Sequence, residues 1–240
     1  MITTAVILAA GKGTRMKELS ADQPKHVIPV NSRPFLFYLL DNLLAAGFKR
    51  LIVVVGYQKP TILQRLSGWT KMPLEIIDQT QKVPPGRYGT LCPVEAVANE
   101  VSGESFVVVS GDNLYSAADL KAMRQASDFN VVAGLEHSHP ECYGVLINTP
   151  KGLLKEIIEK PKSDVGKLIN TGLYTFTPEI FKVLMAVKVS PRGEYELTDA
   201  VTILARQGRV KVKKLNDYWL DFTKPEDIKV VGDFIASGKL

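Results

Sequence analysis

The chain has 240 residues, of which 45% are hydrophobic and 23% are charged, and it carries a formal net charge of +5. This composition is typical of a globular protein with a sizeable core, and two cysteines cannot form the disulfide framework of a small secreted domain. No apolar run reaches the roughly 18 residues of a membrane helix, and the N-terminus lacks the layout of a signal peptide. We therefore expect a cytoplasmic protein with no membrane partner.

The positive charge is compatible with a nucleic-acid binder and with an enzyme that acts on polyanions. The basic residues form neither a tail nor a long run, and the sequence contains no RNA-recognition or zinc-finger motif. A protein that binds single-stranded nucleic acid would also need aromatic stacking platforms, which the sequence does not show. We therefore expect no nucleic-acid partner, and most basic residues are expected to be surface charges.

The first half of the chain alternates apolar segments with helical patterns. Continuous apolar runs predict strands over residues 4–10, 50–56, 73–78 and 105–112. Apolar residues at helical spacing, with prolines near the starts, predict helices over residues 34–48, 60–66 and 93–101. Strands that are apolar throughout and separated by helices are typical of a parallel sheet covered on both faces.

The second half of the chain has a different pattern. Segments with short turns between them predict an antiparallel meander over residues 130–136, 143–149, 154–161 and 168–176. Further apolar patterns predict a strand over 210–215 and helices over 178–186, 196–207 and 225–236. Since no linker rich in proline, glycine or serine separates the halves, we predict a single α/β domain over residues 1–240. Its mostly parallel central sheet would carry an antiparallel addition.

A glycine-containing loop after the first strand is the most informative segment. A P-loop requires Gly-x4-Gly-Lys-Ser/Thr, and Gly11 and Gly13 do not have that spacing. A dinucleotide fingerprint requires a third glycine where Met16 stands and an acidic residue at the end of the second strand, which has none. Backbone N–H groups beside glycines can form an anion-binding nest, and Arg15 and Lys25 add two cations to it. The loop is therefore predicted to hold a polyphosphate.

The string LAAGKGTRM, followed by Pro24-Lys25, resembles the opening motif of the sugar-nucleotide pyrophosphorylases, or NDP-sugar nucleotidyltransferases. The resemblance implies a three-layer Rossmann-like fold of the glycosyltransferase-A type. Residues 1–128 would mainly bind the nucleotide, and residues 129–240 would mainly bind the sugar phosphate. Arg15 and Lys25 would be catalytic, and the NTP would contact Leu8, Ala9, Ala10, Gly11, Lys12, Gly13 and Thr14.

Two aspartates match the metal-binding positions of that family. Asp112 follows a buried strand, at the edge where α/β sheets place their ligands. Asp221 follows Trp219-Leu220 in a segment similar to the closing motif of the family. The resemblance implies that both aspartates are catalytic and hold Mg²⁺ on the nucleotide phosphates. Because the family usually has glycine at the position of Thr223, the backbone beyond Asp221 is expected to differ locally.

Other motifs match the parts of the family that bind the sugar and the base. The resemblance implies a sugar-phosphate site made of Gly144, Glu159, Lys160, Asn170 and Thr171. The base site would contain Gly89 and Thr90 together with a glutamine that precedes them. Gln81 is the candidate for that glutamine and Gln79 is the alternative, because residues 83–87 resemble an insertion that changes the spacing.

The predicted reaction is Mg²⁺-dependent transfer of a nucleotidyl group from an NTP to a sugar 1-phosphate, giving an NDP-sugar and pyrophosphate. A phosphate oxygen would be the nucleophile, so catalysis would rest on positioning and charge stabilisation rather than on a covalent residue. Two alternatives stay open: a cytidylyltransferase acting on a polyol phosphate such as inositol phosphate, and a non-catalytic nucleotide-sugar-binding regulatory module. The sequence favours no particular base or sugar. Dimers or tetramers are common in the family, so a homo-oligomer is expected, and the chain contains no hexapeptide repeats that would form a C-terminal β-helix.

Overall fold

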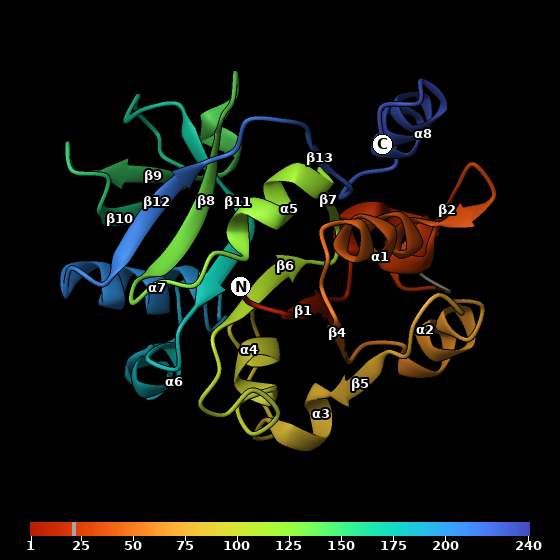
Figure 1. Cartoon of the computed structure of the whole chain (residues 1–240), viewed down its shortest axis with the longest axis horizontal. Coiled ribbons are helices and arrows are strands. Elements are labelled where there is room, and N and C mark those ends of the chain that lie inside the picture. Colours follow the sequence, from red (N-terminus) through yellow and green to blue (C-terminus); the bar gives the residue numbers. More distant parts are fainter. Residues whose placement is uncertain (21–22) are drawn as a thin grey trace.

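The computed structural model describes residues 1–20 and 23–240. Within these residues the largest element is a 9-stranded sheet whose main path runs β10-β9-β11-β6-β1-β4-β5 (Figure 1). Its first-half strands are all parallel to one another and comprise β1 (Thr4–Ala9), β4 (Arg50–Val55), β5 (Glu75–Asp78) and β6 (Phe106–Ser110). These strands confirm the parallel sheet predicted from the apolar runs.

The second-half strands extend the sheet with antiparallel pairs and one parallel edge. They comprise β8 (Asn130–Glu136), β9 (Gly144–Asn148), β10 (Leu154–Glu159), β11 (Leu168–Phe176) and β12 (Val210–Lys214). The predicted meander is wrong, because β11 pairs with β6, β8 and β9 and separates strands that the meander would have paired. With 9 residues, β11 is long enough to pair with β6 at its C-terminal end and with β9 at its N-terminal end.

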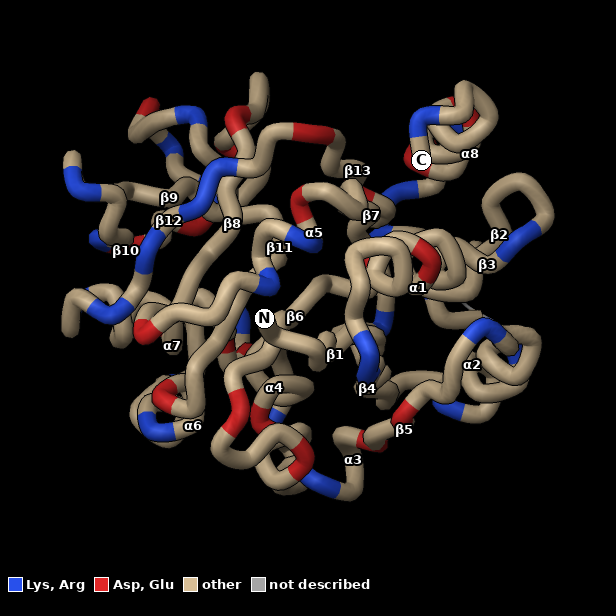
Figure 2. Tube along the Cα trace, in the orientation of Figure 1, with Lys and Arg blue, Asp and Glu red and all other residues tan. Residues whose placement is uncertain are grey.

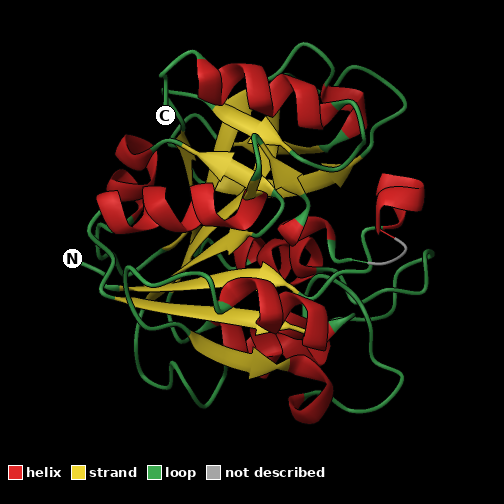
Figure 3. Ribbon diagram, turned by 90° about the vertical axis from the view of Figure 1, so that its right-hand side faces the viewer, coloured by secondary structure: helices red, strands yellow, loops and turns green. Residues whose placement is uncertain are grey.

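Helices cover both faces of the sheet (Figure 3). Because side chains alternate along a strand, Ala5, Ile7 and Ala9 of β1 enter one hydrophobic core while Val6 enters the other. The first core is completed by α1 (Phe35–Ala45), α2 (Lys59–Leu66), α5 (Ala117–Met123) and α8 (Asp227–Ala236). The second core is completed by α4 (Cys92–Ala96), α6 (Ile180–Val183) and α7 (Leu197–Arg206). No helix in the described part of the chain is long and apolar enough to cross a membrane.

Short elements that the sequence patterns did not predict lie at the edge of the sheet. They are β2 (Pro29–Val30) paired with β3 (Arg33–Pro34), β7 (Asn113–Tyr115) paired with β13 (Trp219–Asp221), and α3 (Gln79–Lys82). Runs of two to four residues carry too little periodicity to be recognised. The β7–β13 pair matters most, because its register places Asp221 opposite Asn113, the neighbour of Asp112.

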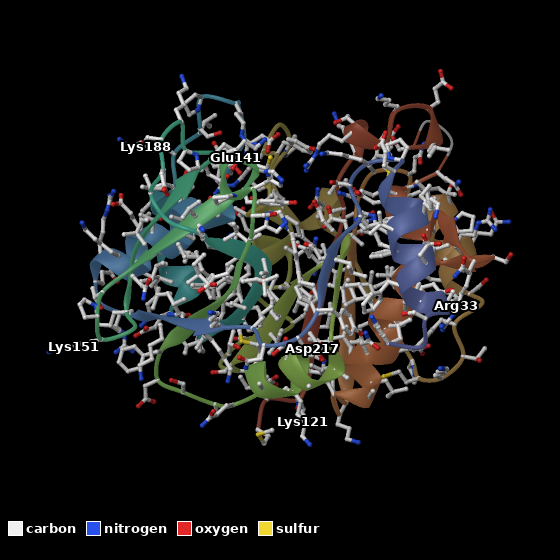
Figure 4. The ribbon with its side chains drawn as sticks, turned by 90° about the horizontal axis from the view of Figure 1, so that it is seen from above. Arg33, Lys121, Glu141, Lys151, Lys188 and Asp217 are labelled. Atoms are coloured by element: carbon white, nitrogen blue, oxygen red, sulfur yellow. The ribbon has the colours of Figure 1, made fainter. Side chains whose placement is uncertain are left out.

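The longest axis of the molecule runs from the β9–β10 turn at one end to the small β2–β3 sheet at the other (Figure 1). Seen from above, Arg33 of β3 and Lys151 of the turn between β9 and β10 lie near opposite ends of that axis (Figure 4). Lysines and arginines are spread over both halves of the chain rather than gathered in one segment (Figure 2). The β6–β11 pairing joins residues on the two sides of position 128, where the sequence was divided into a nucleotide half and a sugar half.

Phe222 ties the segment after β13 to α1 and is the subject of a stability prediction. Its ring is fully buried and stacks on Phe35, with 4.2 Å between the ring centroids. We expect Phe222→Ala to lower the free energy of unfolding by about 3–5 kcal/mol, since the change removes a large buried ring and leaves a cavity. Urea denaturation measures this, and Val230→Ala on the exposed side of α8 is the control, with an expected change below about 0.5 kcal/mol. Equal stability of the two variants would contradict the prediction.

Candidate functional site

A cavity of about 510 Å³ opens at the carboxyl ends of β1 and β6. This is the edge at which α/β sheets bind their ligands. Predicted residues that line it are Leu8, Ala10, Gly11, Lys12, Gly13, Thr14, Arg15, Lys25, Gly89, Thr90, Asp112, Gly144, Glu159, Lys160, Asn170, Thr171 and Asp221. The structure thus brings together side chains that lie up to about 200 residues apart in the sequence. Two predicted residues do not line the cavity: Ala9 is buried within β1, and Gln81 is exposed on α3.

The glycine loop lies at one end of the cavity. A Cβ atom at Gly11 would meet no atom within 4 Å, so the backbone there faces open space. Gly13 has a positive φ of 65° and packs against the side chain of Lys25, 3.2 Å from where its own Cβ would lie. Arg15 forms no ion pair within the described residues and leaves its guanidinium free for a ligand. The loop therefore offers bare backbone and an unpaired cation, as an anion site requires.

Lys25 and Asp112 form an ion pair at the centre of the cavity wall, with side-chain exposures of 11% and 18%. Burial is the largest influence on Asp112 and acts to raise its pKa, but the charge of Lys25, the neighbouring His26 and hydrogen bonds to the carboxylate together hold the pKa below its usual value. His26 lies beneath the pair and is 1% exposed, and its Nδ1 has no hydrogen-bond partner within the described residues. Burial, followed by the charge of Lys25, lowers the pKa of His26 to about 3, so this imidazole is neutral.

Asp221, at the end of β13, also lines the cavity close to Asp112. Its carboxylate accepts hydrogen bonds from Asn113 Nδ2 at 3.1 Å and from Thr223 Oγ1 at 3.1 Å. The backbone N–H of Phe222 donates to the carbonyl of Asp112 at 2.9 Å and fixes the two acidic segments together. Burial, followed by the charge of Asp112, raises the pKa of Asp221 to about 6. Thr223, at a position where glycine was expected, thus has a role of its own, because its hydroxyl orients this carboxylate.

Of the two candidate glutamines, Gln79 lines the cavity and Gln81 does not. The two glutamines are two residues apart on α3 and so point about 200° apart around the helix. Gln79 lines the cavity, and its Oε1 is buried without a hydrogen-bond partner in the described part of the chain. Tyr88 lies nearby, with Lys12 Nζ 5.3 Å from its ring centroid. Of the two candidates that the sequence left open, the structure places Gln79 at the site.

Glu159, Lys160 and Gly144 lie at the opposite end of the cavity. Glu159 of β10 is paired in register with Gly144 of β9, and a Cβ at Gly144 would lie 3.1 Å from the Glu159 carboxylate. Burial raises the pKa of Glu159. Lys160 has a positive φ of 43°, a strained conformation for a residue other than glycine, and its N–H donates to the Tyr143 carbonyl. Lys160 and Glu159 therefore both line the cavity, and the Glu159 carboxylate can accept hydrogen bonds from hydroxyl groups.

Asn170 and Thr171 differ in what they can offer a ligand. The Asn170 amide donates to Tyr174 Oη at 2.6 Å and also accepts from the N–H of Gly172 at 3.1 Å. The Thr171 side chain is buried and donates to the carbonyl of Ala133, and its own carbonyl accepts from Tyr115 Oη at 2.8 Å and from Trp219 Nε1 at 3.1 Å. Thr171 is therefore structural through its side chain, although it borders the site as expected.

Three further side chains line the cavity, although the sequence did not mark them as site residues. Tyr143 and Trp219 pack edge to face with 5.5 Å between their ring centroids and line the cavity beside Asp221. Arg192 also lines it, with a half-exposed side chain that is held by Glu196 at 2.7 Å. The signal for Arg192 was its place two residues before the acidic run Glu194-Tyr195-Glu196, in a loop that leads into a helix.

The chain matches known proteins over almost its whole length. The family model described as nucleotidyl transferase matches residues 4–237. A UTP–glucose-1-phosphate uridylyltransferase, AglF of Haloferax volcanii, is 36% identical over 93% of this chain and 92% of its own length. The bifunctional protein GlmU of Methanococcus aeolicus is 34% identical over 93% of this chain, which spans only 52% of that protein.

A solved structure supports the fold. The structure of a putative glucose-1-phosphate thymidylyltransferase from Bacillus anthracis superposes with a TM-score of 0.80 at 21% identity, covering 96% of this chain and 94% of that chain. This confirms the fold predicted from the sequence, a mostly parallel sheet of the glycosyltransferase-A type with an antiparallel addition. Together with the family match, it confirms the resemblance first recognised in the glycine loop: the chain belongs to the nucleotidyl transferase family and is a nucleotidyltransferase.

Proposed function

We propose that the protein transfers a nucleotidyl group from an NTP to a sugar 1-phosphate and releases pyrophosphate. An oxygen of the sugar phosphate attacks the α-phosphorus, a new P–O bond forms, and the bond between the α- and β-phosphates breaks. The observation that carries the proposal is that one cavity joins the glycine loop, two acidic side chains, and Glu159 and Asn170, whose polar groups suit sugar hydroxyls. The 36% identical relative named for uridylyl transfer to glucose 1-phosphate supports the same substrate class.

Asp112 and Asp221 fit a Mg²⁺ ion. Within the described residues, no group of three histidine, cysteine or acidic side chains could hold a metal ion. Mg²⁺ typically takes one or two carboxylates and completes its shell with waters and substrate phosphates, so the donor set suits it. When bound there, the ion would neutralise charge on the reacting phosphates.

The protein's own side chains do the positioning. Lys25 pairs with Asp112 at the cavity wall and would place its ammonium against the α-phosphate, while Asp112 and Asp221 would hold a metal ion that supplies further positive charge. Arg15 and the backbone of Gly11 and Gly13 hold the β- and γ-phosphates that depart. Lys160 and Arg192 neutralise the sugar phosphate, so that two anions can approach each other. The attacking phosphate oxygen is already ionised at neutral pH, so the reaction needs no general base. The buried His26, with a pKa of about 3, is therefore not assigned that role.

A substrate screen tests the proposal as a whole. The protein is incubated with each common NTP, Mg²⁺ and a panel of sugar 1-phosphates, inositol phosphate and choline phosphate, and pyrophosphate is measured. Release with a sugar 1-phosphate supports the proposal. Release with a polyol phosphate alone would favour the cytidylyltransferase alternative, and the absence of release with every pair would favour a non-catalytic binding module.

The two aspartates give the sharpest loss-of-function prediction. We expect Asp112→Asn and Asp221→Asn each to lower kcat by about 10²-fold or more, because each removes charge that holds the metal ion and the phosphates. Asp233→Asn is the matched control, since Asp233 is an exposed aspartate on α8 that pairs with Lys229. Pyrophosphate release measures all three variants, and wild-type rates in Asp112→Asn would contradict the proposal.

The raised pKa of Asp221 predicts a pH-dependent stability effect. This pKa is about 6 in the folded protein, against about 3.9 for an aspartate in an unfolded chain. Between these values the folded protein binds more protons, so this group lowers the stability of the metal-free protein as the pH rises towards 6. Asp221→Asn should therefore raise the Tm of the metal-free protein at pH 8, and the gain should disappear near pH 4. Thermal melts at both pH values measure this, and an equal gain at each pH would refute it.

Gln79 and Gln81 form a natural pair of variants. Gln79→Ala removes a buried amide at the base end and should raise KM for the NTP about tenfold while leaving KM for the sugar phosphate nearly unchanged. Gln81→Ala should change neither constant by more than about twofold, because Gln81 is exposed and outside the cavity. Steady-state kinetics with both substrates varied tests this, and a larger effect from Gln81→Ala would move the base site.

A further inference from the structure

Glu196 has more contacts than a residue at the start of a helix requires. It is 5% exposed, and its side chain does not cap α7. Its Oε1 accepts from Arg192 Nη2 at 2.7 Å and from Ser190 Oγ at 3.1 Å, and its Oε2 accepts from Thr90 Oγ1 at 3.3 Å. A buried carboxylate with these partners joins the start of α7 to the turn at residues 190–192 and to the loop at Thr90, and both of these segments border the cavity.

Thr90 belongs to the nucleotide side of the cavity, yet its side chain is turned towards α7. Its hydroxyl donates to Glu196 and accepts from the N–H of Leu197 at 2.9 Å, across 107 residues of sequence. The hydroxyl therefore satisfies one of the free N–H groups at the start of α7, which Glu196 leaves unsatisfied. Thr90 is predicted to contact the nucleotide, yet its hydroxyl is bound to Glu196 and Leu197 at the start of α7, in the half of the chain predicted to bind the sugar phosphate.

The backbone around Thr90 is fixed to the same segment. The N–H of Tyr195 donates to the carbonyl of Tyr88 at 2.8 Å, and the N–H of Leu91 donates to the carbonyl of Tyr195 at 3.0 Å. Gly89 has a φ of 136°, and a Cβ there would lie 2.3 Å from the Tyr195 carbonyl oxygen. Two backbone hydrogen bonds therefore keep the loop at Gly89 beside the segment before α7, but only the Thr90 hydroxyl extends this contact to the Glu196 carboxylate.

Arg192 is the cation at the other end of this chain of contacts. Its side chain is 53% exposed, lines the cavity and is held in place by the 6% exposed carboxylate of Glu196. The hydrogen bond from Arg192 to Glu196 also raises the pKa of the guanidinium. Without Glu196, a half-exposed arginine would lose its fixed direction, because a long side chain has many accessible rotamers.

We propose that Glu196 is a positioning residue that holds Arg192 for the sugar phosphate, and that Thr90 links this position to the nucleotide loop. The inference deepens the proposed function and rests on it. An NTP that orders the loop at Gly89 and Thr90 fixes Glu196 and hence Arg192, so it strengthens binding of the sugar phosphate. By thermodynamic linkage the sugar phosphate strengthens binding of the NTP by the same factor.

The test measures this coupling directly. Isothermal titration gives the Kd of glucose 1-phosphate with and without saturating α,β-methylene UTP, which cannot be cleaved at the α–β position. We expect the nucleotide to tighten binding by about fivefold or more in the wild type. In Thr90→Val the factor should fall to about one, while Thr90→Ser, which keeps the hydroxyl, should retain it. Glu196→Gln should weaken glucose 1-phosphate binding with and without nucleotide.

Ser190→Ala is the matched control. It removes one hydroxyl from the same carboxylate but leaves the link through Thr90 intact, so the coupling factor should be retained. Thermal melts monitor the loss of the α7 contact, which lowers the Tm of Thr90→Val whether or not the coupling exists. An unchanged coupling factor in Thr90→Val, or a factor of one in the wild type, overturns the inference. Absence of turnover in the wild type with every NTP and sugar phosphate would instead overturn the proposed function.

Discussion

The approach of like charges is the constraint on which the site depends. Asp112 and Asp221 both lie in the wall of the cavity, where their side chains are largely buried. Burial, followed by the charge of Asp112, raises the pKa of Asp221 to about 6. Lys25 offsets the charge of Asp112, and hydrogen bonds from Asn113 and Thr223 hold Asp221. The two neighbouring carboxylates repel each other in the metal-free protein, and under the proposed function a bound cation would offset that repulsion.

The sheet brings loops of its parallel strands and residues of its antiparallel strands together around the cavity. Parallel strands end in loops that present backbone N–H groups to phosphates, and the antiparallel strands β9 and β10 set Gly144 beside Glu159 in register. β11 joins the two parts, and Gly172 within it has a φ of 73° where a Cβ would lie 2.3 Å from Ser110 Oγ. A side chain at that position would push β11 away from β6, so the glycine keeps these two strands close together beside the cavity.

The main strands and most residues of the cavity could be predicted from the sequence, because they are marked by local apolar runs and short motifs. Apolar runs of five to nine residues gave the main strands, and the motifs around Lys25, Asp112 and Glu159 brought most cavity residues into view. Features that depend on distant contacts were not readable: the pairing of β11 replaced the predicted meander, and Thr90 turned out to contact α7. The choice between Gln79 and Gln81 depended on the rotation of a four-residue helix, which an unusual spacing before Gly89 concealed.

Some departures from local backbone preference lie at or next to the cavity, while others, at Asn31, Ser32 and Gln58, lie outside it. Lys160 adopts a left-handed conformation, Lys17 interrupts the helical turn after the glycine loop, and Gly89 lies against the backbone of Tyr195. Such conformations persist only where surrounding contacts over-determine them, and they commonly mark binding sites. Each of these residues lies in or next to a segment that lines the cavity. At the cavity, strained backbone therefore occurs together with the charged side chains, although the turn between β2 and β3 is strained as well.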